Sequence, residues 1–522
     1  MKTITKTLAT IFILIACLKQ APGQVITAAQ IDDLVSRTLT AFDVPGIAVA
    51  VVKDGKVIHS KGYGVRSLAG KEKVDENTLF GIASNSKAFT AASLGMLMDE
   101  GKLTWDDKVI DHIPEFRMYN SYVTEEFTIR DLLTHRSGLG LGAGDLMFWP
   151  DSSDFTMKDI IYNLRYLKPV SGFRTKYDYD NLLYMVAGEV IERVSGKSYE
   201  EFVEERIMKP LQMNSSAGSW MRVKDKTNAI DAHAPVDGKV QIISRDMFRF
   251  GNSAGGIYSS IADMGKWIMM QMNAGKYGDK RLFSARVHNE MWTPQTIIPV
   301  NAFPPYNTHF SAYGLGWFLS DVKGYKQVTH TGGLAGILTQ VTLLPEIQLG
   351  IIVFTNQQSG GAFTAITNTI KDSYLGIPPT DKVKIYSERM KAGVAKADSI
   401  TKSVWNAISA EQKNNSGMTN YKFFAGTYRD NWLGEISLSE QNGKFRFAAK
   451  RSPKLSGDVF FYKNNTFIVK WDRRSFDADA YLYFQMDKDG KPSSIKMEPI
   501  SPLTDFSFDF QDLDLQRVGE SK

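Results

Sequence analysis

The stretch FGIASNSKAFTAASLGMLMDEG, from Phe80 to Gly101, places Ser84 three residues before Lys87. Because apolar residues fill the rest of the stretch at helical spacing, the sequence predicts a long helix that begins near the serine. Residues three apart share one face of a helix, so the two polar side chains would lie close together. Two interpretations follow: a nucleophile beside an activating lysine, or an N-cap serine on a core helix with a solvated lysine.

The size and composition of the chain are those of an ordinary globular protein. With 522 residues, 43% of them hydrophobic and 23% charged, the sequence is long enough for one large and one small domain. The formal charge of +5 includes Lys2, Lys6 and Lys19, which lie in a segment without acidic residues. Elsewhere lysine and arginine are scattered, so we expect no nucleic-acid partner.

The first 24 residues have the pattern of a signal peptide. Lys2 and Lys6 precede LATIFILIACL, an apolar run too short to be a stable membrane anchor. We therefore expect an exported protein, periplasmic or extracellular. LIAC, which ends at Cys17, resembles a bacterial lipoprotein signal and would attach the chain to a membrane; the alternative is a small apolar residue of the signal core. Cys17 is the only cysteine, so no intrachain disulfide can form.

Residues 25–376 are predicted to form one domain whose sheet uses both ends of the segment. PGIAVAVVKDGKVIHSKGYGV has two β-rich runs around Asp54-Gly55, a strong hairpin signal. Helical and loop-like patterns dominate from about residue 103 to 282, with a helix that should stop at Gly196. Strand patterns then return in YGLGWFLSD, KQVTHTGG, LTQVTLLPE and LGIIVFTNQ.

A linker and a second domain follow. IPPT marks a break, and residues 377–417 are charged and partly helical in pattern, as a connecting tether would be. Residues 418–522 alternate between short strands and turns, which suits a small all-β barrel or sandwich. The turns are indicated by Asn442-Gly443, Asn464-Asn465 and Asp489-Gly490.

Two further patterns favour the catalytic interpretation of Ser84. Tyr179 and Asn181, in KYDYDN, form a Tyr-x-Asn pair just before an apolar helical pattern. His330, in THTGGLAG, is predicted at the end of a strand. The residues that follow it are Thr331, Gly332 and Gly333. Each pattern alone is unremarkable, and only their combination distinguishes this chain.

In this order and spacing, the motifs resemble the serine β-lactamase and penicillin-binding protein superfamily, in the branch that contains class C β-lactamases, D-aminopeptidases, D-Ala-D-Ala carboxypeptidases and related esterases. The resemblance covers about residues 25–376 and includes LLTHRSGL, SAGGIYSSIADMGKW and YGLGW. It implies an α/β (α+β) β-lactamase/transpeptidase-like domain with an antiparallel sheet flanked by helices. The segment that contains FFAGTYRD resembles a small β-barrel domain appended to some of these hydrolases.

The resemblance also implies roles for the polar residues. Ser84 would be the nucleophile, Lys87 would keep the neighbouring proton network charged, and Tyr179 would act as general base and then general acid. Asn181 would orient Lys87 and the substrate amide. A phenol has an unperturbed pKa of about 10, and an adjacent ammonium would favour its anionic form or its role as a proton relay.

The THTGG motif would bind substrate. The resemblance assigns substrate contacts to His330, Thr331 and Gly332, and an oxyanion hole to the backbone N–H groups of Ser84 and Gly333. Drug-hydrolysing relatives usually have lysine where this chain has His330. A histidine near its reference pKa of about 6.5 is mostly neutral at pH 7, so it would hold a substrate carboxylate less firmly, which counts against antibiotic hydrolysis.

A rival nucleophile lies in GNSAG, from Gly251 to Gly255, which matches the Gly-x-Ser-x-Gly elbow of α/β-hydrolases. Ser253 would attack, with Asp321 and His330 downstream in the expected order. The elbow needs a buried strand immediately before it and a helix immediately after it. ISRDMFRF is a poor strand and the next helical pattern begins only near Ser260, so we expect a loop that lines the cleft.

No cofactor or metal site is expected. The seven histidines include no His-x-x-x-His pair, and GLGLGAG follows no strand, which favours a flexible loop over a dinucleotide site. The sequence therefore predicts hydrolysis of amide or ester bonds in a small molecule or peptide, either a peptide with D-amino acids or a β-lactam-like compound. Two alternatives stay open: a broad carboxylesterase, and a penicillin-binding or sensing module that acylates without turnover.

Overall fold

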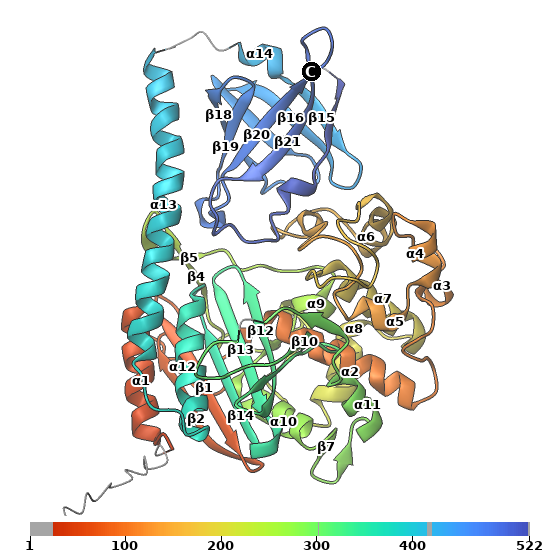
Figure 1. Cartoon of the computed structure of the whole chain (residues 1–522), viewed down its shortest axis with the longest axis vertical. Coiled ribbons are helices and arrows are strands. Elements are labelled where there is room, and N and C mark those ends of the chain that lie inside the picture. The colour runs from red at the N-terminus through yellow and green to blue at the C-terminus, as the bar shows by residue number, and fades with distance from the viewer. Residues whose placement is uncertain (1–24, 301, 415–419, 520–522) are drawn as a thin grey trace, which may run out of the picture.

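The computed structural model describes residues 25–300, 302–414 and 420–519. The predicted signal peptide and Cys17 lie outside the described residues. Figure 1 shows a larger body in which helices pack on a sheet and a smaller β-barrel at the opposite end, with the long helix α13 (Lys382–Asn414) running beside both. The charged pattern of the predicted linker thus corresponds to one helix of 33 residues.

An antiparallel sheet of eight strands forms the centre of the larger body, in the order β2-β1-β14-β13-β12-β11-β10-β9. The first hairpin pairs with the last strand, since Val49 lies opposite Val353. This confirms the prediction that both ends of the segment build one sheet. The turn residues Asp54 and Gly55 both have positive φ, as a tight hairpin turn requires. The strands are β1 Gly46–Lys53, β2 Lys56–Gly64, β9 Thr296–Ile298, β10 Ser311–Tyr313, β11 Phe318–Val322, β12 Tyr325–Leu334, β13 Ile337–Leu344 and β14 Leu349–Thr355.

Strand β1 is buried on both faces of the sheet, which explains its near-continuous apolar sequence. Side chains alternate between the faces of a strand. Ile47, Val49 and Val51 therefore pack with α1 (Ala28–Ala41) and α12 (Gly360–Tyr374). The intervening residues of β1 pack in a second, larger core that includes Trp267 of α10, Ile261–Met272.

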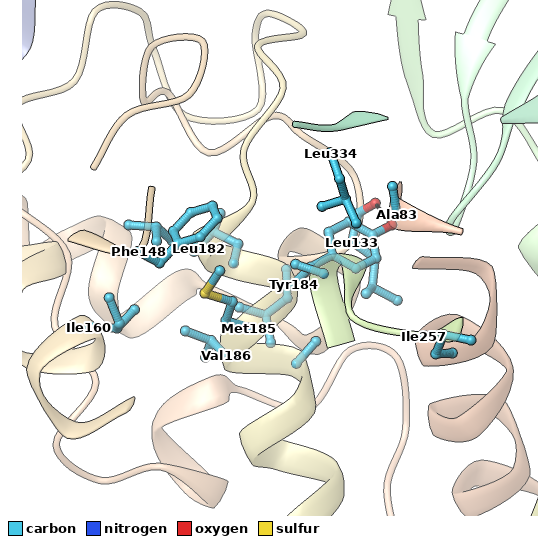
Figure 2. Packing of buried hydrophobic residues seen from close by; sticks show 14 of the residues in the cluster. Ala83, Leu133, Phe148, Ile160, Leu182, Tyr184, Met185, Val186, Ile257 and Leu334 are labelled. Carbon is cyan, nitrogen blue, oxygen red and sulfur yellow. Dashed lines mark hydrogen bonds between the residues drawn. The ribbon is translucent and has the colours of Figure 1, made fainter. Parts of the chain in front are cut away.

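The helical part of the larger body contains the predicted catalytic helix. In α2 (Ser86–Asp99), every residue from Ser86 to Met98 is buried, so this helix lies inside the domain and not on its surface. Helix α7 (Leu182–Ser195) ends at Gly196 with a left-handed φ of 71°, as predicted. Figure 2 shows Tyr184 of α7 close to Leu133 and Ala83 in this core. Other helices are α3 Val109–His112, α4 Ser121–Glu126, α5 Ile129–Leu132, α6 Met157–Asn163, α8 Tyr199–Val203, α9 Asn252–Gly255 and α11 Ala285–Met291.

The C-terminal strands close into a barrel, in agreement with the predicted all-β domain. The expected turn residues Asn442, Gly443, Asn464 and Gly490 all have positive φ. Helix α13 packs on the barrel through Trp405, whose ring meets Phe460 edge to face at 5.5 Å. The barrel strands are β15 Gly426–Asp430, β16 Gly434–Gln441, β17 Lys444–Ala449, β18 Ser456–Lys463, β19 Thr466–Trp471, β20 Ala480–Met486, β21 Pro492–Pro499 and β22 Leu515–Gly519.

Candidate active site

Ser84 lies in a single 3₁₀ turn, η1 (Ala83–Asn85), immediately before α2. The residue before it, Ala83, has a left-handed φ of 50°, an uncommon conformation for a residue with a side chain. Ser84 is not itself the helix N-cap, because the cap position belongs to Asn85 and makes no capping hydrogen bond through its side chain. The N-cap interpretation of Ser84 is therefore wrong, and its side chain lines a cavity instead.

Lys87 is fully buried and points back to Ser84. Its Nζ donates to Ser84 Oγ at 3.2 Å, to Asn181 Oδ1 at 2.7 Å and to the carbonyl of Ala254 at 2.8 Å. Burial lowers the pKa of the Lys87 ammonium to about 7, although the carboxyl groups of Asp145 and Asp180 oppose this change. The interpretation of Lys87 as a solvated surface cation is wrong, and the side chain can exist as a neutral amine near pH 7.

Tyr179 completes this group from the loop before α7. Lys87 Nζ lies 4.8 Å from the centre of the Tyr179 ring, and the centre of the His135 ring lies 4.2 Å from the same point. Burial raises the pKa of the Tyr179 phenol well above its usual value, and the hydrogen bond with Ser84 offsets only part of that rise. The phenol is therefore protonated at neutral pH. This contradicts the anionic form, one of the two expectations for Tyr179, and is compatible with the other, a role as a proton relay.

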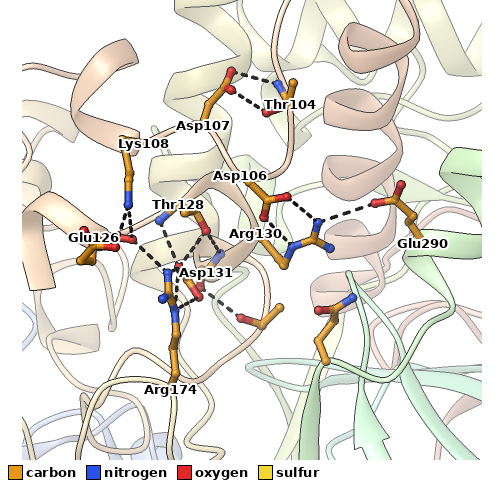
Figure 3. A network of polar contacts seen from close by, with 12 residues as sticks. Thr104, Asp106, Asp107, Lys108, Glu126, Thr128, Arg130, Asp131, Arg174 and Glu290 are labelled. Atoms are coloured by element: carbon orange, nitrogen blue, oxygen red, sulfur yellow. Dashed lines mark hydrogen bonds and ion pairs between the residues drawn. The ribbon is translucent and has the colours of Figure 1, made fainter.

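The loop that carries Tyr179 is anchored by an ionic network, shown in Figure 3. Asp131, at the end of α5, is fully buried and accepts from Arg174 Nη2 at 2.6 Å and from Thr128 Oγ1 at 2.7 Å. Burial opposes ionisation, but these hydrogen bonds hold the pKa of the Asp131 carboxyl below its usual value. Arg174 lies five residues before Tyr179, so the network fixes the start of the loop that carries Tyr179.

Strand β12 carries the THTGG motif past Ser84. The strand continues through Gly332 and Gly333 to Leu334, so His330 is inside the strand rather than at its end. A Cβ at Gly332 would lie 2.3 Å from the carbonyl oxygen of Ile82 and 2.9 Å from Ala83 Cβ, so only glycine allows this close approach to η1. A Cβ at Gly333, by contrast, would meet only one atom within 4 Å, Cδ2 of the Leu338 side chain at 3.3 Å.

His330 is buried, and each of its ring nitrogens lies within hydrogen-bond distance of an oxygen atom. Its Nε2 is 2.9 Å from Tyr313 Oη and its Nδ1 is 2.6 Å from the carbonyl of Thr331. Burial, with a contribution from the charge of Lys87, lowers the pKa of His330 to about 3. The imidazole is thus neutral at any physiological pH. Its cationic form is even less populated than the reference pKa of histidine suggests.

The structure excludes Ser253 as the nucleophile. The GNSAG segment forms the four-residue helix α9, preceded by irregular chain and not by a buried strand. Ser253 is buried, and its Oγ donates to the carbonyl of Tyr184 at 2.9 Å. Asp321, the expected acidic partner, instead accepts from His309. GNSAG does contribute to the cleft, because Gly251, Ala254 and Gly255 line the cavity.

A cavity of about 340 Å³ opens above Ser84. The sequence-predicted residues that line it are Ser84, Tyr179, Asn181, His330, Thr331 and Gly333. Gly332, which was expected to contact substrate, does not line the cavity; its backbone packs against Ile82 and Ala83 instead. Aromatic side chains dominate much of the rest, among them Phe148, Trp149, Tyr177, Phe248 and Phe318.

Three further lining residues, Asp505, Phe506 and Ser507, come from the barrel domain. Sequence reasoning missed them, because no local pattern links them to Ser84 across more than 400 positions. It also missed Asp145, which follows the GLGLGAG loop and accepts from Asn181 Nδ2 at 2.8 Å. Burial raises the pKa of the Asp145 carboxyl well above its usual value, while hydrogen bonds from Ser507 and Asn181 counteract part of the rise.

Two negative findings concern the described part of the chain. Within residues 25–300, 302–414 and 420–519, no group of three or more His, Cys, Asp or Glu side chains is arranged to hold a metal ion. In the same ranges, no helix combines the length and apolar character needed to cross a membrane.

Comparison with known proteins identifies the class to which this fold and site belong. A family model described as Beta-lactamase matches residues 31–374, well over half of the chain, and a Domain of unknown function (DUF3471) matches residues 411–517. The chain therefore belongs to the β-lactamase family, within the serine β-lactamase and penicillin-binding protein superfamily that the motifs resemble.

Similar proteins come from fungi and bacteria. Unguisins hydrolase ungD of Aspergillus violaceofuscus (strain CBS 115571) is 28% identical over 375 residues, which cover 67% of this chain and 65% of the fungal protein. Protein flp of Staphylococcus aureus (strain MW2) is 29% identical over 343 residues, 63% of each chain. The alignments thus span less than two thirds of either relative's length.

A solved structure shares the fold across both domains. The octameric penicillin-binding protein homologue from Pyrococcus abyssi superposes with a TM-score of 0.61 over 94% of this chain and 100% of its own, at 21% sequence identity. At that identity the similarity shows the fold alone.

Proposed function

We propose that the protein is a serine hydrolase that forms an acyl-enzyme on Ser84 and releases the acyl group with water. The observation that carries this proposal is the environment of Lys87: a fully buried amine bonded to Ser84 and Asn181, beside the ring of Tyr179 and below an open cavity. A buried lysine without a strong ion pair is costly, so its presence at the serine favours a chemical role.

The pKa directions suggest a route for the proton. A Lys87 pKa of about 7 leaves a substantial neutral fraction at pH 7, and the neutral amine can take the Ser84 proton as the oxygen attacks. The protonated phenol of Tyr179 can then protonate the leaving group and recover a proton from the lysine. We propose this order in place of one that begins with a Tyr179 phenolate, because burial holds the phenol in its neutral form.

The backbone N–H groups of Ser84 and Gly333 are the proposed oxyanion hole. Support comes from the close packing of β12 against η1, which only glycine at position 332 permits, and from the place of Gly333 on the cavity wall. Donors fixed in this way typically contribute about 3 to 4 kcal/mol each to transition-state stabilisation.

The charge of the cavity indicates the substrate class. Among its lining residues only Asp505 carries a formal charge, and His330 is neutral. No lining cation is present to hold a carboxylate, so we propose that substrates are neutral or amine-bearing amides and esters, including peptides with D-amino acids. Compounds that depend on a carboxylate, such as β-lactams, should react poorly. The fungal relative is named as a hydrolase, which favours turnover over passive binding.

A second candidate, a broad carboxylesterase, is favoured by the aromatic lining of the cavity, which accepts apolar acyl groups of many shapes. The test is a substrate panel of p-nitrophenyl acetate, D-alanine p-nitroanilide and benzylpenicillin. We expect turnover of the first two, with β-lactam acylation at least about tenfold slower. Ester turnover without any D-anilide turnover would select the esterase, and a stable penicilloyl adduct without product release would overturn the hydrolase proposal.

Ser84→Ala supplies the matched control for this panel. Turnover should fall at least about 1000-fold in that variant. Ser36→Ala, on the exposed face of α1, should leave turnover unchanged.

Export and lipidation are separate proposals that rest on the sequence of residues 1–24. We propose that the protein is exported and acylated at Cys17. Cells that express the wild type should incorporate radiolabelled palmitate into it, and Cys17→Ser should abolish the label. An unlabelled product released from the cell would contradict lipidation but keep export, whereas a full-length cytoplasmic product would contradict both.

A further inference from the structure

The barrel domain reaches into the cavity through the loop between β21 and β22. Ser507 in this loop is buried, and its Oγ donates to Asp145 Oδ2 at 2.7 Å. Beside it, the ring of Phe506 meets Tyr179 edge to face, with ring centres 5.8 Å apart. One loop of the second domain thus contacts both a catalytic aromatic ring and the carboxyl group behind it.

A continuous chain of hydrogen bonds runs from this loop to the nucleophile. Asp145 Oδ2 also accepts from Asn181 Nδ2 at 2.8 Å. The Oδ1 atom of Asn181 accepts from Lys87 Nζ at 2.7 Å, and Lys87 in turn donates to Ser84 Oγ at 3.2 Å. Four contacts therefore link the barrel to the attacking oxygen.

A second set of hydrogen bonds fixes the loop that carries Ser507. Two residues further on, Asp509 is fully buried and accepts from the backbone of Gly144 at 2.6 Å and of Leu146 at 3.1 Å. These two groups flank Asp145 in sequence. The barrel thus fixes the backbone on both sides of Asp145 as well as its side chain.

The hydrogen bond from Ser507 matters for Asp145 because, in the part of the chain that the structure describes, only one of the two carboxyl oxygens of Asp145 accepts hydrogen bonds. Within the described residues, Oδ1 is buried without a hydrogen-bond partner, and both donors bind Oδ2. If Ser507 were absent, a single amide would have to orient a buried carboxyl group. Asn181 would then be free to turn its amide, which would present N–H groups to Lys87 and remove an acceptor from the lysine.

We propose that Ser507, on the barrel domain, is a positioning residue for the hydrolysis at Ser84: it fixes Asp145, which orients Asn181 and through it Lys87. The inference rests on the proposed function. It gives the barrel a direct part in acylation, and it means that the active site is complete only when the two domains are docked.

The test compares three variants of the full-length chain. Ser507→Ala removes the hydroxyl and Ser507→Thr keeps it. Ser501→Ala is the matched control, because the Ser501 hydroxyl accepts from the backbone N–H of Leu503 in the same loop and Ser501 does not line the cavity. For p-nitrophenyl acetate, Ser507→Ala should lower kcat about tenfold or more with KM within about twofold, since the interaction acts on chemistry and not on binding. Ser507→Thr should recover most of kcat, and Ser501→Ala should match the wild type.

The pH profile separates positioning from a merely structural role. Loss of the Ser507 hydrogen bond makes the Asp145 carboxyl easier to protonate, and a neutral Asp145 no longer supports the ammonium form of Lys87. The acid limb of kcat should therefore move to lower pH in Ser507→Ala and stay in place in Ser501→Ala. The titratable groups that face Lys87 are Asp145, Asp180, His135, His330, Tyr179 and Tyr184. Of these, the carboxyl groups of Asp145 and Asp180 are coupled to the titration of Lys87 on this limb.

Each outcome decides the proposal. Unchanged kcat and an unchanged acid limb in Ser507→Ala would overturn it while leaving the hydrolase function intact. Wild-type turnover that does not depend on Ser84 would overturn the proposed function, and this inference with it. Should Ser507→Ala fail to fold, Ser507→Cys fills the same space with a weaker donor, and a wild-type kcat in that variant would contradict the proposal.

Discussion

Complete burial gives Lys87 its chemical character. Water stabilises an ammonium strongly, and its removal lowers the pKa of Lys87 from 10.5 to about 7. The same burial raises the pKa of Tyr179, so the phenol stays protonated at neutral pH while a neutral fraction of the Lys87 amine becomes available beside Ser84. At the scale of one residue, desolvation therefore makes the Lys87 amine available as a base.

The first prediction concerns pH. Because acylation needs the neutral amine, kcat/KM for a neutral ester should fall below about pH 7 with a single acid limb that belongs to Lys87 and its carboxyl neighbours. Stopped-flow hydrolysis between pH 5 and 9 measures this limb. Lys87→Arg, whose side chain stays charged, should lose activity at least about 100-fold at every pH. A flat profile for the wild type would contradict the role given to Lys87.

The second prediction concerns His330. A lysine at this position would add a cation to the cavity wall, so His330→Lys should raise the ratio of benzylpenicillin acylation to neutral-ester hydrolysis about tenfold or more. His330→Gln, which adds no charge, should leave the ratio near that of the wild type. If both variants behave alike, the missing cation is not what limits reaction with carboxylate-bearing compounds.

At the scale of the element, the contact between β12 and η1 sets the geometry of the proposed oxyanion hole. Gly332→Ala would force the strand away from the carbonyl of Ile82 and should cost about 1 to 3 kcal/mol of stability, with at least about a tenfold loss of kcat. Gly333→Ala displaces only the flexible side chain of Leu338 and should fold and react almost normally. Urea unfolding and ester kinetics on both variants make the comparison, and equal effects would contradict this account of the strand.

The turns and helix ends that depend on a few local residues were predicted correctly from the sequence. Asp54-Gly55 marks the first hairpin, Gly196 ends α7, and Asn442-Gly443 turns a barrel hairpin, because each needs a backbone conformation that few residues adopt. The strand end placed at His330 was wrong. Glycines weaken strand propensity, but pairing with β13 carries β12 through Gly333 to Leu334.

At the scale of the whole molecule, polar contacts couple the barrel to the larger body. Asp151 pairs with Lys454 of the barrel, and Arg451 pairs with Asp154 and Asp159. Asn163 donates to the carbonyl of Trp432 at 3.0 Å. The sequence predicted the serine, lysine, tyrosine and histidine of the site because family motifs are local. It could not predict Asp145, whose contact with Asn181 exists only in the folded domain. Nor could it predict Phe506 and Ser507, which reach the site only because the barrel docks on the larger body.

The interface gives a prediction about stability and pH. Burial, with the nearby Asp151 and Asp505 charges, raises the pKa of Asp246 to about 7. The unfolded carboxyl titrates near 3.8, so this group's contribution to stability is complete below that pH and is lost as pH rises toward 7. Asp246→Asn keeps the acceptor for the Ala335 N–H and should exceed the wild type in stability by about 1 to 2 kcal/mol at pH 8, with no gain at pH 4.

The matched control for this prediction is Asp151→Asn, which breaks the pair with Lys454 and should lose stability at pH 8. Urea unfolding at the two pH values measures both variants. A gain for Asp246→Asn that is equal at pH 4 and pH 8 would show that the carboxyl is not the source of the pH dependence.

The proposed function depends first on Ser84 being the nucleophile. The most direct measurement treats the full-length protein with a fluorophosphonate, digests it and locates the added mass by mass spectrometry, with Ser84→Ala beside it. We expect a single modified peptide that carries the added mass on Ser84, and no label in the variant. Label on another serine, or labelling that persists in Ser84→Ala, would contradict this expectation.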